Sequence, residues 1–235
     1  MKRILMVLTS HAGMENTEST TGVWLGEFTD PYYEFIDAGW QVTLCSPEGG
    51  KPPVDPLSTV TENITQANRR FIDDTAAKMA FENTFMLHEI DPTMFDAVFY
   101  PGGHGPLWDL AFNEFSGRLI LHYLSAGKPV GAVCHGPAAL TIAAELKPGL
   151  LAGRNITAFT NEEEVLVFRA NNIPYKLEDR LKELGANFRS AALPFVSHVE
   201  TDGLLVTGQN PLSAGAAARR LIALVHEQAG LAAHK

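Results

Sequence analysis

A cysteine followed directly by a histidine stands out in residues 130–140, which read VGAVCHGPAAL. A cysteine thiolate is a strong nucleophile, and an imidazole beside it can accept and return a proton. Cys134 ends an apolar run and precedes Gly-Pro-Ala-Ala, which is typical of a buried strand that turns sharply into a helix. Ala132 and Gly136 are the small neighbours that such a strained turn requires. The pattern predicts a nucleophile elbow at Cys134, with His135 beside it.

The expected position of Cys134 at the start of a helix has two chemical consequences. The free N–H groups and partial positive charge at a helix start favour a thiolate, so we expect a lowered pKa for the Cys134 thiol. The same N–H groups can stabilise an oxyanion, and a second donor is expected from the glycine-rich segment YPGGHG at 100–105. Gly103, His104 and Gly136 are therefore the predicted oxyanion or substrate-binding residues. The alternative for His104 is a polar residue on a loop.

Free cysteines are often inert core residues, and this alternative applies to both cysteines of the chain. It is the preferred interpretation for Cys45, which ends the apolar segment QVTLC and has no base nearby in the sequence. For Cys134 the adjacent His135 and the upstream glycine-rich loop favour a functional role. Two cysteines are too few for a disulfide framework, so a reducing cytoplasm is the expected compartment.

Apolar segments of strand length alternate with longer segments of helical period along the chain. Strands that are apolar on both faces favour a mostly parallel sheet sandwiched by helices. We predict a doubly wound α/β fold, with functional groups beyond the carboxyl ends of the strands, and a single domain over 1–235. The stretch 46–58, rich in proline and glycine, is expected to form an ordered loop over the site. The expected strands are 4–8, 41–45, 97–100, 129–133, 156–159 and 204–207, and the expected helices are 27–38, 115–125, 137–145, 175–184 and 213–228.

Composition and charge argue against several classes of protein. The 235 residues carry a formal net charge of -9 and are 46% hydrophobic and 19% charged, as in an ordinary globular protein. We expect no nucleic-acid partner, because no basic face is visible, and no membrane partner, because no apolar run is long enough to span one. The opening MKRILMVLTSHAG resembles a signal peptide, but its apolar run is short and predicts a strand instead. No two of the eight histidines form an HxxxH or HxH pair, so no metal site is predicted.

Four stretches of the chain resemble a known superfamily. FDAVFYPGGHGPLWDL (95–110) and GKPVGAVCHGPAAL (127–140) are similar to the DJ-1/PfpI superfamily, which has the class I glutamine amidotransferase-like fold. TGVWLGEFTDPYYEFIDAGWQV (21–42) and TDGLLVTGQNPLSA (201–214) resemble its Hsp31-like branch, whose members include glutathione-independent glyoxalases, also called glyoxalase III. The resemblance covers nearly the whole chain. It implies a flavodoxin-like sheet, a homodimer and no cofactor.

The resemblance also implies roles for individual residues. Cys134 would be the nucleophile, His135 its imidazole partner, and Glu27 the acid that hydrogen-bonds the sulfur and moves protons. An acidic residue after the next strand would orient the histidine, and the chain reads NEEE at 161–164. The spacing in the family favours Glu164, while Glu163 stays open as the alternative.

Simpler explanations exist for the same acidic and aromatic residues. If Asn161 is the N-cap of a helix, the glutamates after it lie in the first turn, where acidic side chains suit the helix dipole. This explains the presence of at least two of the three glutamates without a catalytic role. Glu27 alone is equally compatible with a solvated acid in a first helical turn. Three aromatic residues are candidates for the wall of a cavity, although each taken singly suits core packing: Trp24, Trp108 and Phe195.

The function that the resemblance implies is conversion of a small 2-oxoaldehyde, methylglyoxal or glyoxal, to lactate or glycolate. Addition of the Cys134 thiolate to the aldehyde would give a hemithioacetal, and proton transfer and hydrolysis would follow. One alternative is an amidase, glutaminase or peptidase, for which the late pair His198 and Glu200 resembles the base of class I amidotransferases. The other is a stress-response chaperone or a cysteine redox sensor.

Overall fold

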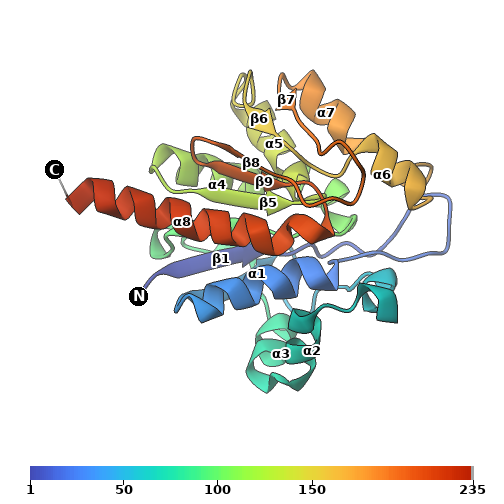
Figure 1. The fold of residues 1–235 in the computed structure, drawn as a ribbon, viewed down its shortest axis with the longest axis horizontal. Coiled ribbons are helices and arrows are strands. Elements are labelled where there is room, and N and C mark those ends of the chain that lie inside the picture. The colour runs from blue at the N-terminus through green and yellow to red at the C-terminus, as the bar shows by residue number, and fades with distance from the viewer. Residues whose placement is uncertain (234–235) are drawn as a thin grey trace.

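The computed structural model describes residues 1–233 and contains a seven-stranded sheet with helices on both faces (Figure 1). The strand order is β3-β2-β1-β4-β5-β9-β8, and every neighbouring pair is parallel except β8 and β9. This arrangement confirms the predicted doubly wound α/β class. The strands are β1 (Arg3–Val7), β2 (Gln41–Ser46), β3 (Phe85–Met86), β4 (Ala97–Tyr100), β5 (Val130–Val133), β8 (Val199–Asp202) and β9 (Leu205–Gly208).

Two hydrophobic cores lie on the two faces of the sheet, because successive strand residues point in opposite directions. Ile4 and Met6 of β1 pack beneath α1 (Leu25–Asp37) and α8 (Ala214–Ala233), which lie side by side in Figure 1. Leu5 and Val7 belong to the other core, beneath α4 (Glu114–Ser125) and α5 (Ala139–Leu146). The strands thus read as continuous apolar runs because both faces are covered.

The remaining elements lie at the periphery of the sheet, and several were not predicted. α2 (Gln66–Asp73) and α3 (Thr75–Glu82) follow the 46–58 stretch, and α2 contacts α1. α6 (Asn161–Leu166) and α7 (Leu177–Glu183) lie near a second, two-stranded sheet made of β6 (Asn155–Ile156) and β7 (Asn187–Phe188) (Figure 1). Short 3-10 turns connect the elements at Pro56–Thr59, Thr61–Asn63, Leu87–Glu89, Pro92–Met94, Gly105–Leu107, Gly136–Ala138 and Pro211–Ser213.

The strand expected at 156–159 is wrong, because the chain leaves the strand after Ile156. The Thr157 N–H donates to the Thr207 side chain, and the Phe159 N–H donates to the carbonyl oxygen of Cys134. The backbone N–H groups of this segment therefore bond to β9 and to the residue after β5, and they do not pair with a neighbouring strand. The segment supports the elbow instead of extending the sheet.

β1 pairs with β2 on one side and with β4 on the other. The chain therefore adds strands first on one side of β1 and then on the opposite side, which makes this a switch point of the sheet. In open α/β sheets the crevice at such a switch point is where ligands bind. The segments that leave the carboxyl ends of β1, β4 and β5 carry Glu27, Gly102 and Cys134. Within residues 1–233, no helix has the length and apolar character needed to cross a bilayer.

Candidate active site

Cys134 lies at a strained turn directly after β5, as the sequence predicted. Its φ is +59°, in the left-handed region that a non-glycine residue rarely adopts. The turn is held on both sides, since the Cys134 N–H donates to Gly208 O over 2.9 Å and Cys134 O accepts from the Phe159 N–H over 3.0 Å. These contacts fix the direction of the side chain.

Gly136 supports this turn from behind. A Cβ on Gly136 would lie 2.2 Å from the carbonyl oxygen of Tyr100, so only glycine allows β4 and the elbow to approach this closely. Gly136 does not line the cavity that Cys134 lines. The position of Gly136 in the structure serves packing, and its contact with substrate stays a prediction.

A cavity of about 630 Å³ opens beside the sulfur. Gly103 and His104 line it as predicted, and so do Trp24 and Phe195. Trp108 does not, because it stacks on His11 with ring centroids 4.8 Å apart. The stretch 46–58 contributes Leu57, and the segment after it contributes Glu62, Asn63, Ile64 and Thr65. The remaining lining residues are Gly26, Glu27, Asp30, Cys134, Phe159, Val167, Arg169, Pro211 and Leu212.

His135 connects the sulfur to a buried carboxylate. Its Nδ1 lies 3.3 Å from Cys134 Sγ, and its Nε2 lies 2.5 Å from Glu164 Oε1. Burial opposes ionisation of Glu164, but the imidazoles of His135 and His104 outweigh it and hold the pKa of Glu164 well below its usual range. An ionised Glu164 can only accept hydrogen bonds, so it holds the His135 proton on Nε2 and leaves Nδ1 free to accept a proton from the thiol.

Glu163 is buried too but points elsewhere. It accepts from the Phe195 N–H over 2.9 Å, from Asn210 Nδ2 over 2.9 Å and from Gln209 Nε2 over 3.1 Å. Glu163 also completes a capping box with Thr160, which is the N-cap of α6. The expectation of Asn161 as the N-cap is therefore wrong by one residue. Of the two glutamates that the sequence left open, Glu164 contacts His135.

This geometry separates the expected effects of two neighbouring substitutions. Glu164→Gln places an amide N–H against His135 Nε2, which favours the wrong tautomer, so kcat should fall by about 100-fold or more. Glu163→Gln weakens the hydrogen bonds that join α6 to Phe195, Gln209 and Asn210 and leaves His135 untouched, so it should lower the free energy of unfolding by about 2 kcal/mol and leave kcat within about threefold. Steady-state kinetics and urea unfolding of both variants measure the two effects. Equal losses of kcat in both variants would contradict the assignment.

Glu27 faces Cys134 from the first turn of α1 and is fully buried. Its Oε2 accepts from the Gly102 N–H over 2.9 Å, while Oε1 has no hydrogen-bond partner among the residues described. A Cβ on Gly102 would lie 2.4 Å from Glu27 Oε2, so the glycine allows this contact. Burial raises the pKa of Glu27 to about 8, and contacts with the Cys134 side chain and the Gly102 N–H lower it only in part. The alternative of a solvated acid is wrong.

The raised pKa makes the stability of the protein depend on Glu27 and pH. The unfolded chain releases this proton above the ordinary value of 4.5, whereas the folded protein holds it until about pH 8. The free energy of unfolding therefore loses a contribution as the pH rises through this window. Glu27→Gln has no such proton, so its stability relative to wild type should increase by roughly 3 kcal/mol between about pH 5.5 and pH 8. Urea unfolding at both pH values measures this, and a difference independent of pH would contradict it.

The pKa of the Cys134 thiol does not follow the sequence-based expectation. Burial raises it well above its ordinary value, Glu27 raises it further, and a hydrogen bond from the Gly103 backbone lowers it only in part. The expected lowering is wrong, because α5 begins only at Ala139, beyond a 3-10 turn, and desolvation outweighs the helix N-terminus. The buried thiol therefore needs a base in contact, which His135 provides. Cys45 is buried without such a base, as predicted, and burial raises the pKa of its thiol.

Only one group among the described residues has the spacing of a metal site, and it overlaps this network. His104, His135 and Glu164 place ligand atoms within 4.8 Å of one another. However, Glu164 already bonds both rings, and the Arg169 guanidinium lies 3.1 Å from His104 Nδ1. A fixed positive charge at that distance opposes a cation, so the group fits a hydrogen-bonded chain better than a metal site.

Two residues of this network were missed in the sequence. Arg169 follows α6, and Asp55 lies in the stretch 46–58; they form a buried ion pair. No local pattern marks either one, because 114 positions separate them. In the late pair, by contrast, His198 Nε2 lies 2.9 Å from Glu200 Oε1 without the geometry of a hydrogen bond, and neither residue lines the cavity.

The fold and the site define an α/β protein with a cysteine at a nucleophile elbow, a histidine beside it and buried acids around both. The chain belongs to the DJ-1/PfpI family, which matches residues 19–224. It is 30% identical to the glutathione-independent glyoxalase HSP31 of Saccharomyces cerevisiae over 231 residues, which are 94% of this chain and 97% of that protein.

Solved structures show the same similarity. The rapid encystment protein 24 kDa of Francisella tularensis has a TM-score of 0.90 and 35% identity, and the match covers 96% of this chain and 99% of that one. Glyoxalase III from Candida albicans has a TM-score of 0.85 and 27% identity, over 95% of this chain and 97% of that one. These similarities confirm the family and the Hsp31-like branch that the sequence motifs indicated.

Proposed function

We propose that this protein is a glutathione-independent glyoxalase, which converts methylglyoxal to lactate and glyoxal to glycolate. The observation that carries the proposal is the placement of Cys134 Sγ in a cavity, 3.3 Å from His135 Nδ1 and facing the buried carboxyl of Glu27. A thiol, a base and an acid with a pKa of about 8 are the groups that an internal oxidation and reduction of a 2-oxoaldehyde requires. The named glyoxalases among its relatives support the same activity.

The first step forms a bond between the sulfur and the aldehyde carbon. His135 Nδ1 takes the thiol proton as Sγ adds to this carbon, and Glu27 gives its proton to the resulting alkoxide. The product is a hemithioacetal beside a Glu27 carboxylate and a His135 imidazolium, which the ionised Glu164 stabilises. The Gly103 N–H, which contacts the sulfur, lies close enough to assist this step.

The second stage moves one hydrogen between the two carbons. Glu27 removes the proton from the former aldehyde carbon while His135 protonates the ketone oxygen, which gives an enediol. Glu27 then returns its proton to the second carbon, and His135 takes the proton of the first hydroxyl, which leaves a thioester of the 2-hydroxy acid. One carbon is oxidised as its neighbour is reduced, so no external electron acceptor is consumed.

Water completes the cycle by hydrolysing the thioester. Glu27 takes a proton from the attacking water, and the His135 imidazolium protonates the departing sulfur. The 2-hydroxy acid leaves, and Cys134, His135 and Glu27 return to their starting protonation states.

A direct assay separates this proposal from an amidase or glutaminase. Purified protein is incubated with methylglyoxal in buffer without glutathione, and lactate is measured; a parallel sample with glutamine is assayed for ammonia. We expect lactate and no ammonia, since His198 and Glu200 are not at the cavity. Ammonia without lactate would overturn the proposal. A cytoplasmic location, which rests on the small number of cysteines, is part of the proposal, and so are a homodimer and a role in the stress response, which rest on the family resemblance.

A further inference from the structure

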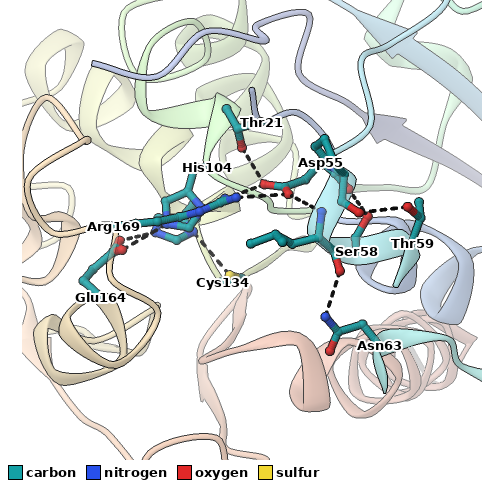
Figure 2. A network of polar contacts seen from close by, with 12 residues as sticks. Thr21, Asp55, Ser58, Thr59, Asn63, His104, Cys134, Glu164 and Arg169 are labelled. Carbon is teal, nitrogen blue, oxygen red and sulfur yellow. Dashed lines mark hydrogen bonds and ion pairs between the residues drawn. The ribbon is translucent and has the colours of Figure 1, made fainter. Parts of the chain in front are cut away.

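A buried ion pair joins the segment over the cavity to the candidate active site. Arg169 binds Asp55 through two contacts, Nη1 to Oδ2 over 2.5 Å and Nη2 to Oδ1 over 3.2 Å. Asp55 also accepts from Thr21 Oγ1 over 2.9 Å (Figure 2). It accepts from the Leu57 N–H over 3.0 Å as well. The carboxylate that holds the Arg169 side chain is therefore itself fixed in place, by Thr21 from a distant segment and by the backbone of the turn that follows Asp55.

The same guanidinium contacts His104, and this contact determines where the proton of His104 lies. Arginine can only donate hydrogen bonds, so His104 Nδ1, 3.1 Å from Arg169 Nη1, must be the acceptor. A neutral His104 then carries its proton on Nε2, which lies 3.0 Å from Glu164 Oε2. Figure 2 shows the resulting chain, which runs from Asp55 through Arg169, His104 and Glu164 toward Cys134.

The proton on His104 Nε2 matters because Glu164 divides its two oxygens between two histidines. Oε2 accepts from His104, and Oε1 accepts from His135, the residue in contact with the sulfur. If His104 carried its proton on Nδ1, its Nε2 would be an acceptor facing a carboxylate, and Glu164 would turn away. His135 would then lose the partner that holds its own proton on Nε2.

We propose that Arg169, anchored by Asp55, is a positioning residue that holds His104 in its Nε2–H form and thereby keeps Glu164 aligned with His135 and Cys134. The effect of Arg169 on turnover rests on the proposed function; its effect on His104 does not. The charged and titratable groups that face His104 are His135 from the elbow, Glu164 from α6 and Arg169 after α6. Burial, the nearby His135 and the guanidinium together lower the pKa of His104 to about 4, despite the opposing Glu164.

The test is ¹⁵N nuclear magnetic resonance of the histidine rings together with steady-state kinetics, in wild type, Arg169→Met and Arg169→Lys. His104→Gln identifies the His104 signals. In wild type we expect the neutral Nε2–H form between about pH 5 and pH 8. Arg169→Met should let His104 protonate or change tautomer within that range, and kcat should fall about tenfold or more while KM stays within about twofold. Arg169→Lys keeps a donor and a positive charge and should retain the Nε2–H form and most of kcat.

A second variant keeps the test valid if Arg169→Met fails to fold, since methionine leaves Asp55 buried without a cation. Asp55→Asn/Arg169→Met removes both charges and should show the same change at His104. Asp55→Asn alone keeps Arg169 and should keep the wild-type tautomer. An unchanged His104 tautomer in the variants without Arg169, or a changed tautomer with unchanged kcat, would overturn the proposal.

A wild-type protein without glyoxalase activity would contradict the proposed function, but not the role of Arg169. The kinetic measurement is then replaced by the rate at which iodoacetamide alkylates Cys134 as a function of pH, which reports on the pair of His135 and Cys134 without a substrate. A profile that is the same with and without Arg169 would overturn the inference in that case.

Discussion

Replacing Cys134 with alanine is expected to lower the kcat for methylglyoxal by at least about a thousandfold, as when the nucleophile of a catalytic unit is removed. Alanine cannot bond to the aldehyde carbon, so neither the hemithioacetal nor the thioester can form. The remaining bases still surround the cavity, but without the sulfur they have no activated carbon to act on. Lactate formation in buffer without glutathione measures the effect.

The matched control is Cys45→Ala, which removes the other cysteine of the chain. Cys45 ends β2, is fully buried and does not line the cavity. Its loss should leave kcat within about twofold, because a small core substitution changes stability without reaching the site. Wild-type activity in the Cys134→Ala protein, or an equal loss in both variants, would contradict covalent catalysis by Cys134.

Glu27→Gln is expected to lower kcat by about 10²- to 10⁴-fold, the range of general acid–base contributions. Glutamine has nearly the same shape, and its carbonyl oxygen can still accept from the Gly102 N–H, but it cannot take or give the proton that moves between the two carbons. A carboxyl group with a pKa of about 8 suits both directions of this transfer near neutral pH. Removing it should therefore affect turnover much more than binding.

Asp30→Asn provides the control for this substitution. Asp30 lies on the same helix and also lines the cavity, but it bonds Thr65 and has no contact with the sulfur. Its kcat should change by less than about fivefold, since it takes no part in general acid–base chemistry. Comparable losses in the two variants would mean that the charge of the cavity, and not the proton of Glu27, determines the rate.

The sequence predicted the parts of the site that depend on local geometry. An apolar strand, small flanking residues and the sequence Cys-His-Gly-Pro indicate an elbow, and the left-handed backbone at Cys134 confirms it. The role of Glu27 was implied by the family resemblance, and the topology agrees with it, because the carboxyl ends of parallel strands lie together. The elbow was predictable because it depends on a few neighbouring residues.

The parts that the sequence did not predict depend on long-range contacts and on burial. Arg169 and Asp55 carry no local signal, and only the folded chain places them against His104. The pKa of Cys134 was expected to fall from the effect of a helix start alone, whereas desolvation of the sulfur and the facing Glu27 are larger in the folded protein. The choice between Glu163 and Glu164 likewise required side-chain directions, since both are buried in the same turn of α6.

The most direct test of covalent catalysis is mass spectrometry of protein that is quenched during turnover of methylglyoxal and then digested. We expect one substrate unit, bound as the thioester, on the peptide that contains Cys134 in wild type and less of it in Glu27→Gln, where the hemithioacetal reverts to the aldehyde and the free thiol instead of proceeding to the thioester. The adduct should be absent at this position in Cys134→Ala. The account would be contradicted if wild type produced lactate while carrying adducts only on lysine and arginine side chains. The amount of these adducts would then be the same in wild type and in Cys134→Ala.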